Sequence, residues 1–300
     1  MSLARLSEFR LLAELERRGL AERIDADGAE LGDGLVLTQD ILVEGVHFRR
    51  EWTSWHDLGY KAAAVNLSDL AAMAAEPEAL FVVLGAPPET NASALVELYE
   101  GLNEPGVPVR GGDTTSAPQL VVAVTALGRS ERVPGRSGAR PGDVLVVTGP
   151  LGGAAAGLRV LERDLEGFDE LVRSHNRPPY RLDAGRELGP LAHALLNLSD
   201  GIASDAQRIA ERSGVKLVVD VERLPLAERL AELGDEAFWT LGEDYELLAA
   251  LAPDDAERFD YPAVGRVEAG EGVELVRDGR RLEPSGWDHF TERARTDDRA

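Results

Sequence analysis

Apolar segments rich in β-branched residues alternate along this chain with segments of helical periodicity. This layout is typical of α/β proteins. The pattern predicts strands at residues 34–40, 79–86, 119–128, 143–149, 216–221 and 246–251. It predicts helices at residues 7–18, 55–75, 90–103, 152–163, 182–195 and 204–213. We therefore expect sheets covered by helices, with ligands bound beyond the strand ends.

The length favours two such units, because the chain has 300 residues and a typical domain has about 150. Residues 129–143, RSERVPGRSGARPGD, interrupt the pattern with glycine, proline and arginine. Such a composition is typical of a linker between domains. We predict one domain over residues 1–137 and a second over residues 138–300.

The charge balance excludes some classes of partner. The chain has 54 acidic and 32 basic residues, a formal net charge of −22, which argues against nucleic acid as a ligand. It has no cysteine, so neither disulfides nor thiolate chemistry are expected. No apolar run approaches the roughly 20 residues of a membrane span. The first residues predict an amphipathic helix instead of a signal peptide. We expect a cytoplasmic protein with no membrane partner.

One carboxylate interrupts a buried helical pattern. In the predicted helix 55–75, Leu58, Ala62 and Val65 follow the spacing of a core-facing stripe, and Asp69 comes four residues after Val65. An unpaired carboxylate on a buried face is costly. Asp69 therefore needs a metal cation, an arginine or several hydrogen-bond donors beside it.

Other acidic residues lie where an apolar strand meets a turn or where a helix begins. They are Asp27, Asp40, Asp113, Asp200 and Asp205. Each one alone is typical of a helix N-cap or an Asp-Gly turn, and this structural interpretation stays open. If they converge with Asp69, their mutual repulsion requires divalent cations, and hard oxygen ligands favour Mg²⁺. The set together predicts a magnesium site.

The usual phosphate-binding signatures are missing. The sequence has neither a G-x-x-x-x-G-K-[ST] loop nor a G-x-G-x-x-G turn after a strand. Its only lysines, Lys61 and Lys216, match neither standard kinase lysine. The glycines of GGDTT, residues 111–115, allow backbone N–H groups to approach phosphate. TGPLGG, residues 148–153, is more typical of an ordinary turn.

Several longer motifs resemble one family. YKAAAVNLSDLAAMAAEP, RGGDTT, RSGARPGD, LSDGIASD and GEDYEL resemble the thiamine-monophosphate kinase family. That family belongs to the superfamily of aminoimidazole ribonucleotide synthetase and selenophosphate synthetase. The similarity extends from about Ile24 to Phe290, and ILVEGVHF and WDHF point to the thiamine-phosphate branch.

The resemblance implies a two-domain PurM-like α/β (α+β) fold and a homodimer, in which the N-terminal domains pair their sheets into a barrel. The N-terminal domain would bind ATP and metal and form the dimer, and the C-terminal domain would complete the active site. The implied reaction is phosphorylation of thiamine monophosphate to thiamine diphosphate. ATP would be the co-substrate, several Mg²⁺ ions would be required, and the phosphoryl group would move by direct in-line transfer.

The resemblance also implies roles for individual residues. The metal ligands would be Asp27, Thr38, Gln39, Asp40, Asp69, Asp113, Asp200 and Asp205, with Asp69, Asp113 and Asp200 central to catalysis. ATP would be held by Gly112, Asp113, Arg136 and Ser204. Thiamine monophosphate would contact His47, Glu243 and Trp287.

The sequence departs from the family at two positions. The first acidic turn usually reads Gly-Asp-Asp, but here it is Asp25-Ala26-Asp27, and Gln39 stands where threonine is common. The first change replaces one of the two family aspartates with Ala26, which alters the set of carboxylates that the resemblance assigns to metal binding at this turn. The alternatives are another ATP-using synthetase of the superfamily, or a catalytically impaired dimer that still binds nucleotide or metal. The missing cysteine and the WDHF motif disfavour the synthetases, and the retained carboxylates disfavour the impaired protein.

Overall fold

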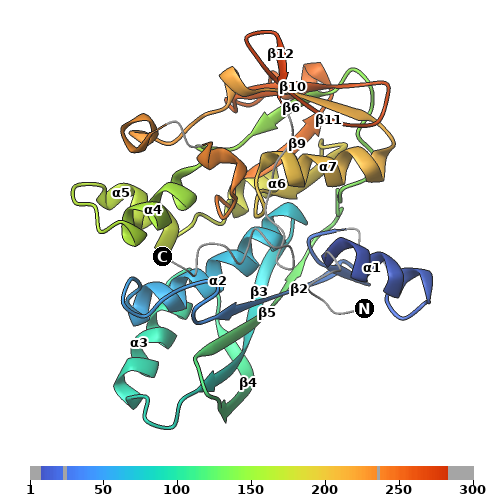
Figure 1. Ribbon diagram of the computed structural model, residues 1–300. Helices are drawn as coiled ribbons and strands as arrows, with labels where there is room; N and C mark the ends of the chain where they lie inside the picture. The colour runs from blue at the N-terminus through green and yellow to red at the C-terminus, as the bar shows by residue number, and fades with distance from the viewer. Residues whose placement is uncertain (1–7, 23–25, 235–236, 283–300) are drawn as a thin grey trace.

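The chain folds into two α/β domains, each built on one sheet (Figure 1). The computed structural model describes residues 8–22, 26–234 and 237–282. The N-terminal sheet ends with β5 at Arg129, and the C-terminal sheet begins with β6 at Val144. Within these described residues, none of the helices combines the length and the apolar character that a membrane span needs.

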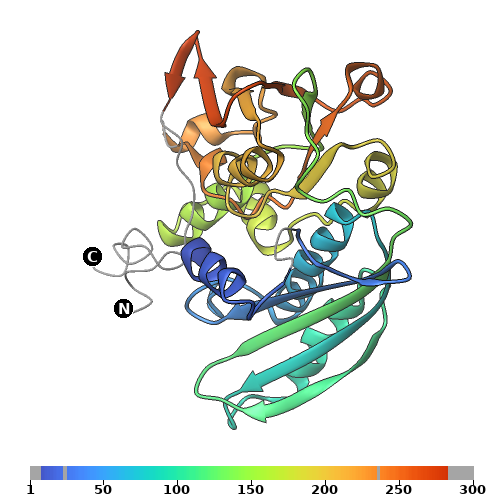
Figure 2. The same ribbon diagram turned by 90° about the vertical axis from the view of Figure 1, so that its right-hand side faces the viewer.

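The N-terminal domain has a five-stranded sheet in the order β1-β2-β5-β3-β4, in which only the β3–β4 pair is parallel. Its elements are α1 (Glu8–Arg17), β1 (Ala29–Gly32), β2 (Leu35–Val43), α2 (Trp55–Ala72), β3 (Glu76–Ala86), α3 (Ala92–Asn103), β4 (Val109–Ser116) and β5 (Val121–Arg129). Alternation along the strands turns Val36, Leu80 and Val124 toward α2. One face of the sheet is thus covered by helices (Figure 2).

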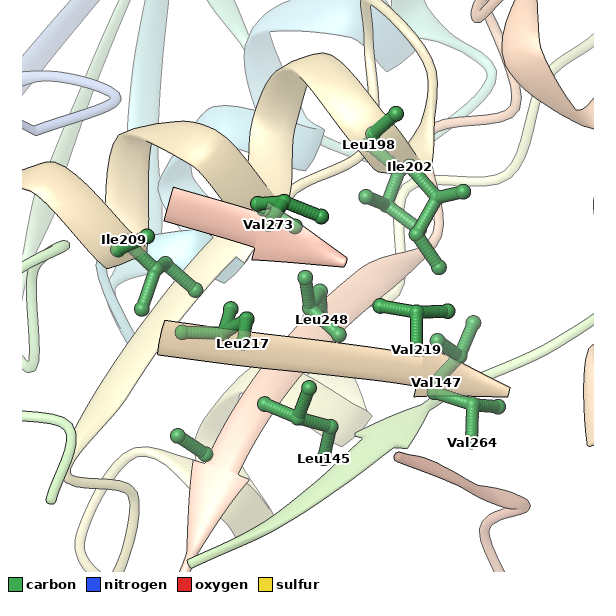
Figure 3. Packing of buried hydrophobic residues seen from close by; sticks show 14 of the residues in the cluster. Leu145, Val147, Leu198, Ile202, Ile209, Leu217, Val219, Leu248, Val264 and Val273 are labelled. Atoms are coloured by element: carbon green, nitrogen blue, oxygen red, sulfur yellow. The ribbon is translucent and has the colours of Figure 1, made fainter. Parts of the chain in front are cut away.

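The C-terminal domain has a seven-stranded sheet in the order β12-β11-β8-β10-β6-β9-β7. Its strands are β6 (Val144–Val147), β7 (Ala194–Asn197), β8 (Lys216–Asp220), β9 (Leu247–Leu251), β10 (Ala263–Glu268), β11 (Gly272–Arg277) and β12 (Arg280–Leu282). Its helices are α4 (Gly153–Glu162), α5 (Asp169–Asn176), α6 (Leu182–Leu188), α7 (Ile202–Ser213) and α8 (Pro253–Ala256), with single 3-10 turns at η2 (Val221–Arg223), η3 (Leu230–Leu233) and η4 (Phe238–Thr240). Figure 3 shows Ile202 and Ile209 of α7 packed among Leu217, Val219 and Leu248 of the sheet.

Helix α2 is buried on nearly all its faces because it lies between the two domains. Leu58 and Leu67 pack into the N-terminal core, whereas Ala71 and Ala72 pack against Leu188 in the C-terminal domain. A helix that is apolar all round is expected in such a central position. The predicted one-sided stripe is therefore wrong, and Asp69 lies on a part of the helix surface that keeps some exposure to solvent.

All six predicted strands are confirmed, and the predicted helices are confirmed apart from one boundary error. The helix predicted at 182–195 ends at Leu188, and Ala194–Asn197 forms β7 instead. Gly189 and Pro190 explain the stop, because proline cannot continue a helix. Two acids predicted at strand ends also lie elsewhere: Asp40 lies inside β2 and Asp113 inside β4.

Candidate functional site

Asn66 of α2 holds β2 in place at Thr38 and Asp40. The Oγ1 of Thr38 donates to the Asn66 carbonyl oxygen at 3.2 Å, and the Asp40 backbone N–H donates to Asn66 Oδ1 at 3.1 Å. The Asn66 amide in turn donates to the Ala62 carbonyl oxygen at 3.0 Å. These bonds hold the inward face of β2 against α2, so Asp40 lies close enough to interact with Asp69.

Asp69 lies where like charges gather at the domain boundary. Burial raises its pKa well above the usual value, and the Asp40 and Asp27 carboxylates raise it further. Asn197 of the C-terminal domain donates from Nδ2 to Asp69 Oδ1 at 2.7 Å, and Arg136 opposes the rise. Asp69 thus accepts one hydrogen bond and lies near one arginine, but its surroundings still disfavour the ionised form.

Asp27 is held by Arg136, which comes from the segment between the two sheets. Arg136 donates to Asp27 Oδ1 at 2.8 Å, and only 2% of the Asp27 side chain is exposed. The second oxygen, Oδ2, is buried and has no hydrogen-bond partner in the described structure. A buried oxygen of this kind is costly and suits an external cation.

A second acidic pair is formed by Asp200, which lies between β7 and α7, and Asp205 in the first turn of α7. The Asp200 N–H donates to Asp205 Oδ2 at 3.0 Å. Arg208 pairs with Asp200, and its Nε lies 3.7 Å from Asp205 Oδ1. Burial and the Asp200 charge raise the pKa of Asp205 to about 7. The turn needs glycine at 201, because a Cβ there would lie 2.3 Å from the Thr240 carbonyl oxygen, and its φ is +94°.

Arg136 connects the two acidic groups electrostatically, since it interacts with Asp27, Asp205 and Asp69. Nevertheless, the described residues contain no group of three or more acidic or histidine side chains already arranged to hold a metal ion. The two acidic groups therefore interact through Arg136, without a preassembled set of metal ligands among the described residues.

Asp113 is separated from these groups. Strand pairing places Asp113 beside Val83, whose side chain is 45% exposed and turned away from α2. Asp113 Oδ1 accepts the Thr114 N–H at 2.8 Å. Gly112 beside it has a φ of +144°, and a Cβ there would lie 1.7 Å from the Val82 carbonyl oxygen. The described chain therefore does not bring Asp113 to Asp69. Glycine is required at 112 because β3 packs directly against its Cα, and the predicted approach of its N–H to phosphate stays a prediction.

Three of the other predicted residues that the structure describes lie on separate segments. Gln39 is exposed on β2, and Ser204 lies half-buried in the first turn of α7. His47 lies in the turn after β2, where its Nδ1 accepts the Val43 N–H at 3.0 Å. Trp287 lies outside the described residues.

Glu243 belongs to the segment GEDYEL, residues 242–247, whose backbone is strained. Gly242, Glu243 and Tyr245 have φ values of +85°, +60° and +50°, which are costly for residues with side chains. Lys61 of α2 donates to Glu243 Oε2 at 3.1 Å, and Nδ1 of His175 lies 3.4 Å from the same oxygen.

The next two acids of this segment are also paired. Asp244 accepts the Gly152 N–H at 2.7 Å, at the N-terminus of α4. The TGPLGG turn therefore binds a carboxylate of the same chain, in agreement with its assignment as an ordinary turn. Glu246 is bound by Arg181 through both oxygens and accepts the Thr148 hydroxyl at 2.7 Å.

Sequence reasoning missed Asn66, Asn197 and Lys61 as functional candidates. A usable signal was present, since each one interrupts an apolar run within a motif, in VNLSD, LLNLSD and YKAAAV. A polar residue inside a buried run needs a specific partner.

A cavity of about 460 Å³ opens between the domains near the start of α6. Tyr60, Tyr180 and Tyr261 line it together with Arg181 and Arg186. Both arginines are already paired with carboxylates. None of the predicted site residues that the structure describes lines this cavity.

Comparison with known families matches most of the chain. Residues 25–130 match the AIR synthase related protein N-terminal domain, and residues 140–277 match the corresponding C-terminal domain. Thiamine-monophosphate kinase of Aquifex aeolicus is 34% identical over 97% of this chain and 100% of its own length. The enzyme of the same name from Mycobacterium tuberculosis is 37% identical over 97% of this chain and 94% of its own.

Solved structures agree with these sequence matches. A structure described as AaThiL complexed with AMPPCP and TMP has a TM-score of 0.90 and 34% identity, covering 97% of this chain and 99% of that one. Escherichia coli HypE, a hydrogenase maturation protein, has a TM-score of 0.70 at 20% identity, covering 92% of this chain and 97% of its own. The second likeness shows the fold alone.

Proposed function

The chain belongs to the thiamine-monophosphate kinase family of AIR synthase related proteins, with its PurM-like two-domain α/β fold, and we propose that it uses ATP to phosphorylate thiamine monophosphate to thiamine diphosphate. The enzyme class follows from relatives of that name. A relative bound to AMPPCP and TMP supports the two substrates. The observation that carries the proposal is the excess of buried carboxylates over cations around Asp69.

The acidic groups suit Mg²⁺, which prefers hard oxygen ligands. Asp27 Oδ2 lacks a partner, and the Asp69 pKa is raised by its neighbours. We propose as ligands Asp27, Thr38, Gln39, Asp40, Asp69, Asp200 and Asp205. Asp113 is left out because strand pairing places it on the opposite face of the sheet from Asp40. When bound, the ions would neutralise phosphate charge and relieve the repulsion among the carboxylates.

The residues of the chain then have to position the substrates. The attacking group is a phosphate oxygen of thiamine monophosphate. A phosphate monoester with a second pKa of about 6 is mostly dianionic at pH 7, so no general base is required. Arg136 offers a planar fork to the ATP phosphates, and Gly112 and Ser204 offer a backbone and a hydroxyl donor. In-line alignment supplies much of the catalysis.

The thiamine end of the substrate is assigned to His47, Glu243 and Trp287. The thiazolium ring is cationic, so a carboxylate and an electron-rich aromatic ring are suitable partners. Of these residues, Glu243 has the best-defined surroundings, and 29% of its side chain is exposed. We propose that this exposed portion contacts the substrate.

The free face of the N-terminal sheet supports a homodimer. Ile41, Phe81 and Val83 are 51%, 38% and 45% exposed there, and an apolar sheet face of this kind is normally covered. We propose that two chains pair these faces into a barrel and that residues 1–137 form the ATP-binding and dimerising domain. Residues 138–300 would complete a cytoplasmic enzyme. Sedimentation should give twice the 32.3 kDa chain mass.

The proposed function is tested by incubating the protein with Mg-ATP and thiamine monophosphate and measuring thiamine diphosphate. Product formation at the expense of ATP is expected. Nucleotide binding without product would instead favour the catalytically impaired dimer, and ATP use with another acceptor would favour a synthetase.

We propose that Trp287 stacks on the thiazolium cation. Trp287→Ala should then raise the KM for thiamine monophosphate by roughly 2- to 30-fold.

A further inference from the structure

Lys61 is a buried lysine that pairs with one carboxylate among the described residues. Only 1% of its side chain is exposed, and its Nζ lies 3.1 Å from Glu243 Oε2. A buried ammonium is costly unless it is paired, so this contact has to persist in the folded protein. Lys61 lies on α2 of the N-terminal domain and Glu243 in the C-terminal domain, so the pair spans the domain boundary.

His175 of α5 completes the surroundings of Glu243. The imidazole is buried, and its Nδ1 lies 3.4 Å from Glu243 Oε2. Burial and the nearby Lys61 charge lower the pKa of His175, so the ring is neutral at pH 7. The group therefore contains one cation and one anion. Although burial alone would raise it, the pKa of Glu243 is held well below its usual value by Lys61 and His175.

The Glu243 carboxylate contacts buried side chains on one side and solvent on the other. Its partners Lys61 and His175 are almost fully buried, whereas 29% of the Glu243 side chain is exposed. The backbone at Glu243 is in the left-handed region, at a φ of +60°, and such strain persists only where surrounding contacts enforce it. The carboxylate thus has a fixed orientation and a free surface.

We propose that Lys61 is a positioning residue, which holds the Glu243 carboxylate ionised and correctly oriented for the thiamine end of the substrate. This inference rests on the proposed function, since it takes thiamine monophosphate as the ligand of Glu243. It also distinguishes Lys61 from the lysines of other kinases, which contact ATP phosphates. Lys61 Nζ is bound instead to a carboxylate from the other domain.

The test is Lys61→Met, with steady-state constants measured for each substrate separately. The KM for thiamine monophosphate should rise about tenfold or more, the scale for loss of a supporting residue. The KM for ATP and kcat should stay within about twofold, because Lys61 touches neither the nucleotide nor the reacting atoms. Lys216→Met is the matched control, since Lys216 is the only other lysine and pairs with Glu268 and Glu274 on β10 and β11.

A double-variant cycle removes the ambiguity of a folding defect. Glu243→Gln should raise the KM for thiamine monophosphate, and adding Lys61→Met to it should cause no further rise, because the group to be positioned is already gone. The double variant leaves neither charge of the pair without its partner, so it can be assayed even if Lys61→Met lowers stability.

Three results would overturn the inference. These are equal changes in both KM values, a loss confined to kcat or to the KM for ATP, and full additivity in the cycle. If the wild-type protein formed no thiamine diphosphate, the proposed function would have failed. A normal wild type with an unselective Lys61→Met would refute only the role of Lys61.

Discussion

Two sets of buried acids in this protein differ in how their charges are balanced. The GEDYEL acids, Glu243, Asp244 and Glu246, each have a partner within the chain: Lys61, the N-terminus of α4, and Arg181. The aspartates around Asp69 are balanced only in part, by Arg136 and Arg208.

The difference in pairing indicates which acids mainly stabilise the fold and which are available to bind ligands. A buried ion pair whose partners both belong to the chain is complete when the chain folds, and breaking it costs stability. A set of like charges with fewer cations than carboxylates among the described residues lowers stability, and an external cation can offset that loss. Asp244 and Glu246 should therefore respond to mutation mainly in stability. Glu243, whose side chain is 29% exposed, should respond in substrate binding as well, and the aspartates around Asp69 in activity and metal dependence.

The largest effect is expected on kcat, when a residue of the second set is changed. Asp69→Asn should lower kcat by about 10³-fold or more, while the fold persists because asparagine still accepts the hydrogen bond from Asn197. Turnover and the thermal unfolding curve should be measured together. Asp183→Asn, an acid 86% exposed on α6, is the matched control and should leave kcat unchanged. A near-normal rate for Asp69→Asn would make the aspartates structural, like Asp244 and Glu246.

The next largest effect is expected on stability, when a partner of the first set is removed. Arg181→Met leaves Glu246 buried with only the Thr148 hydroxyl as a partner, so the free energy of unfolding should fall by about 2–4 kcal/mol. Urea titration measures this fall. Arg186→Met is the control, because Arg186 is 50% exposed and pairs of that kind contribute at most about 1 kcal/mol. If Arg181→Met instead changed kcat without a loss of stability, the proposed division between the sets would be wrong.

The sequence predicted the central strands because their residues are apolar and β-branched. It missed β4, Val109–Ser116, because VRGGDTTS is polar and glycine-rich and forms an exposed edge strand. It also missed α5, since DELVRSHN lacks a clear apolar period. In these segments tertiary position overrides local propensity.

The site was predictable as a set of residues but only partly as an arrangement. Acids that interrupt apolar runs could be identified one by one. The contact between Lys61 and Glu243 could not, because 182 residues separate them and the packing of two domains brings them together. The pairing register of the strands likewise places Asp113 on the opposite face of the sheet from Asp40.

A smaller effect is expected when an apolar side chain replaces Asp69, which tests whether this carboxylate destabilises the fold without Mg²⁺. Asp69→Leu should be more stable than the wild type by about 1–3 kcal/mol without Mg²⁺, because an unfavourable buried carboxylate is gone. Mg²⁺ with an ATP analogue at about 100 times its Kd should stabilise the wild type by about 2.7 kcal/mol. EDTA should cancel that gain, and the variant should show little of it. A less stable variant in EDTA would mean that Asp69 is already satisfied by the chain.

The smallest effect concerns Asp244, the member of the paired set without a cation. Burial raises its pKa to about 7, although the N–H groups of Gly152 and Ala154 oppose the rise. In the unfolded chain the pKa is about 4, so between these values the folded state binds a proton that the unfolded state lacks. Stability therefore falls as pH rises through this window, and the loss is complete above the folded pKa.

Asp244→Asn isolates this contribution, because the amide oxygen can still accept from Gly152 but cannot titrate. Between pH 6 and 7 the metal-free wild type should lose about 1 kcal/mol more stability than the variant. Urea unfolding at both pH values in EDTA measures the difference. An identical pH dependence would mean that Asp244 is already ionised at pH 6. The helix N-terminus alone would then balance its charge, as completely as Arg181 balances that of Glu246.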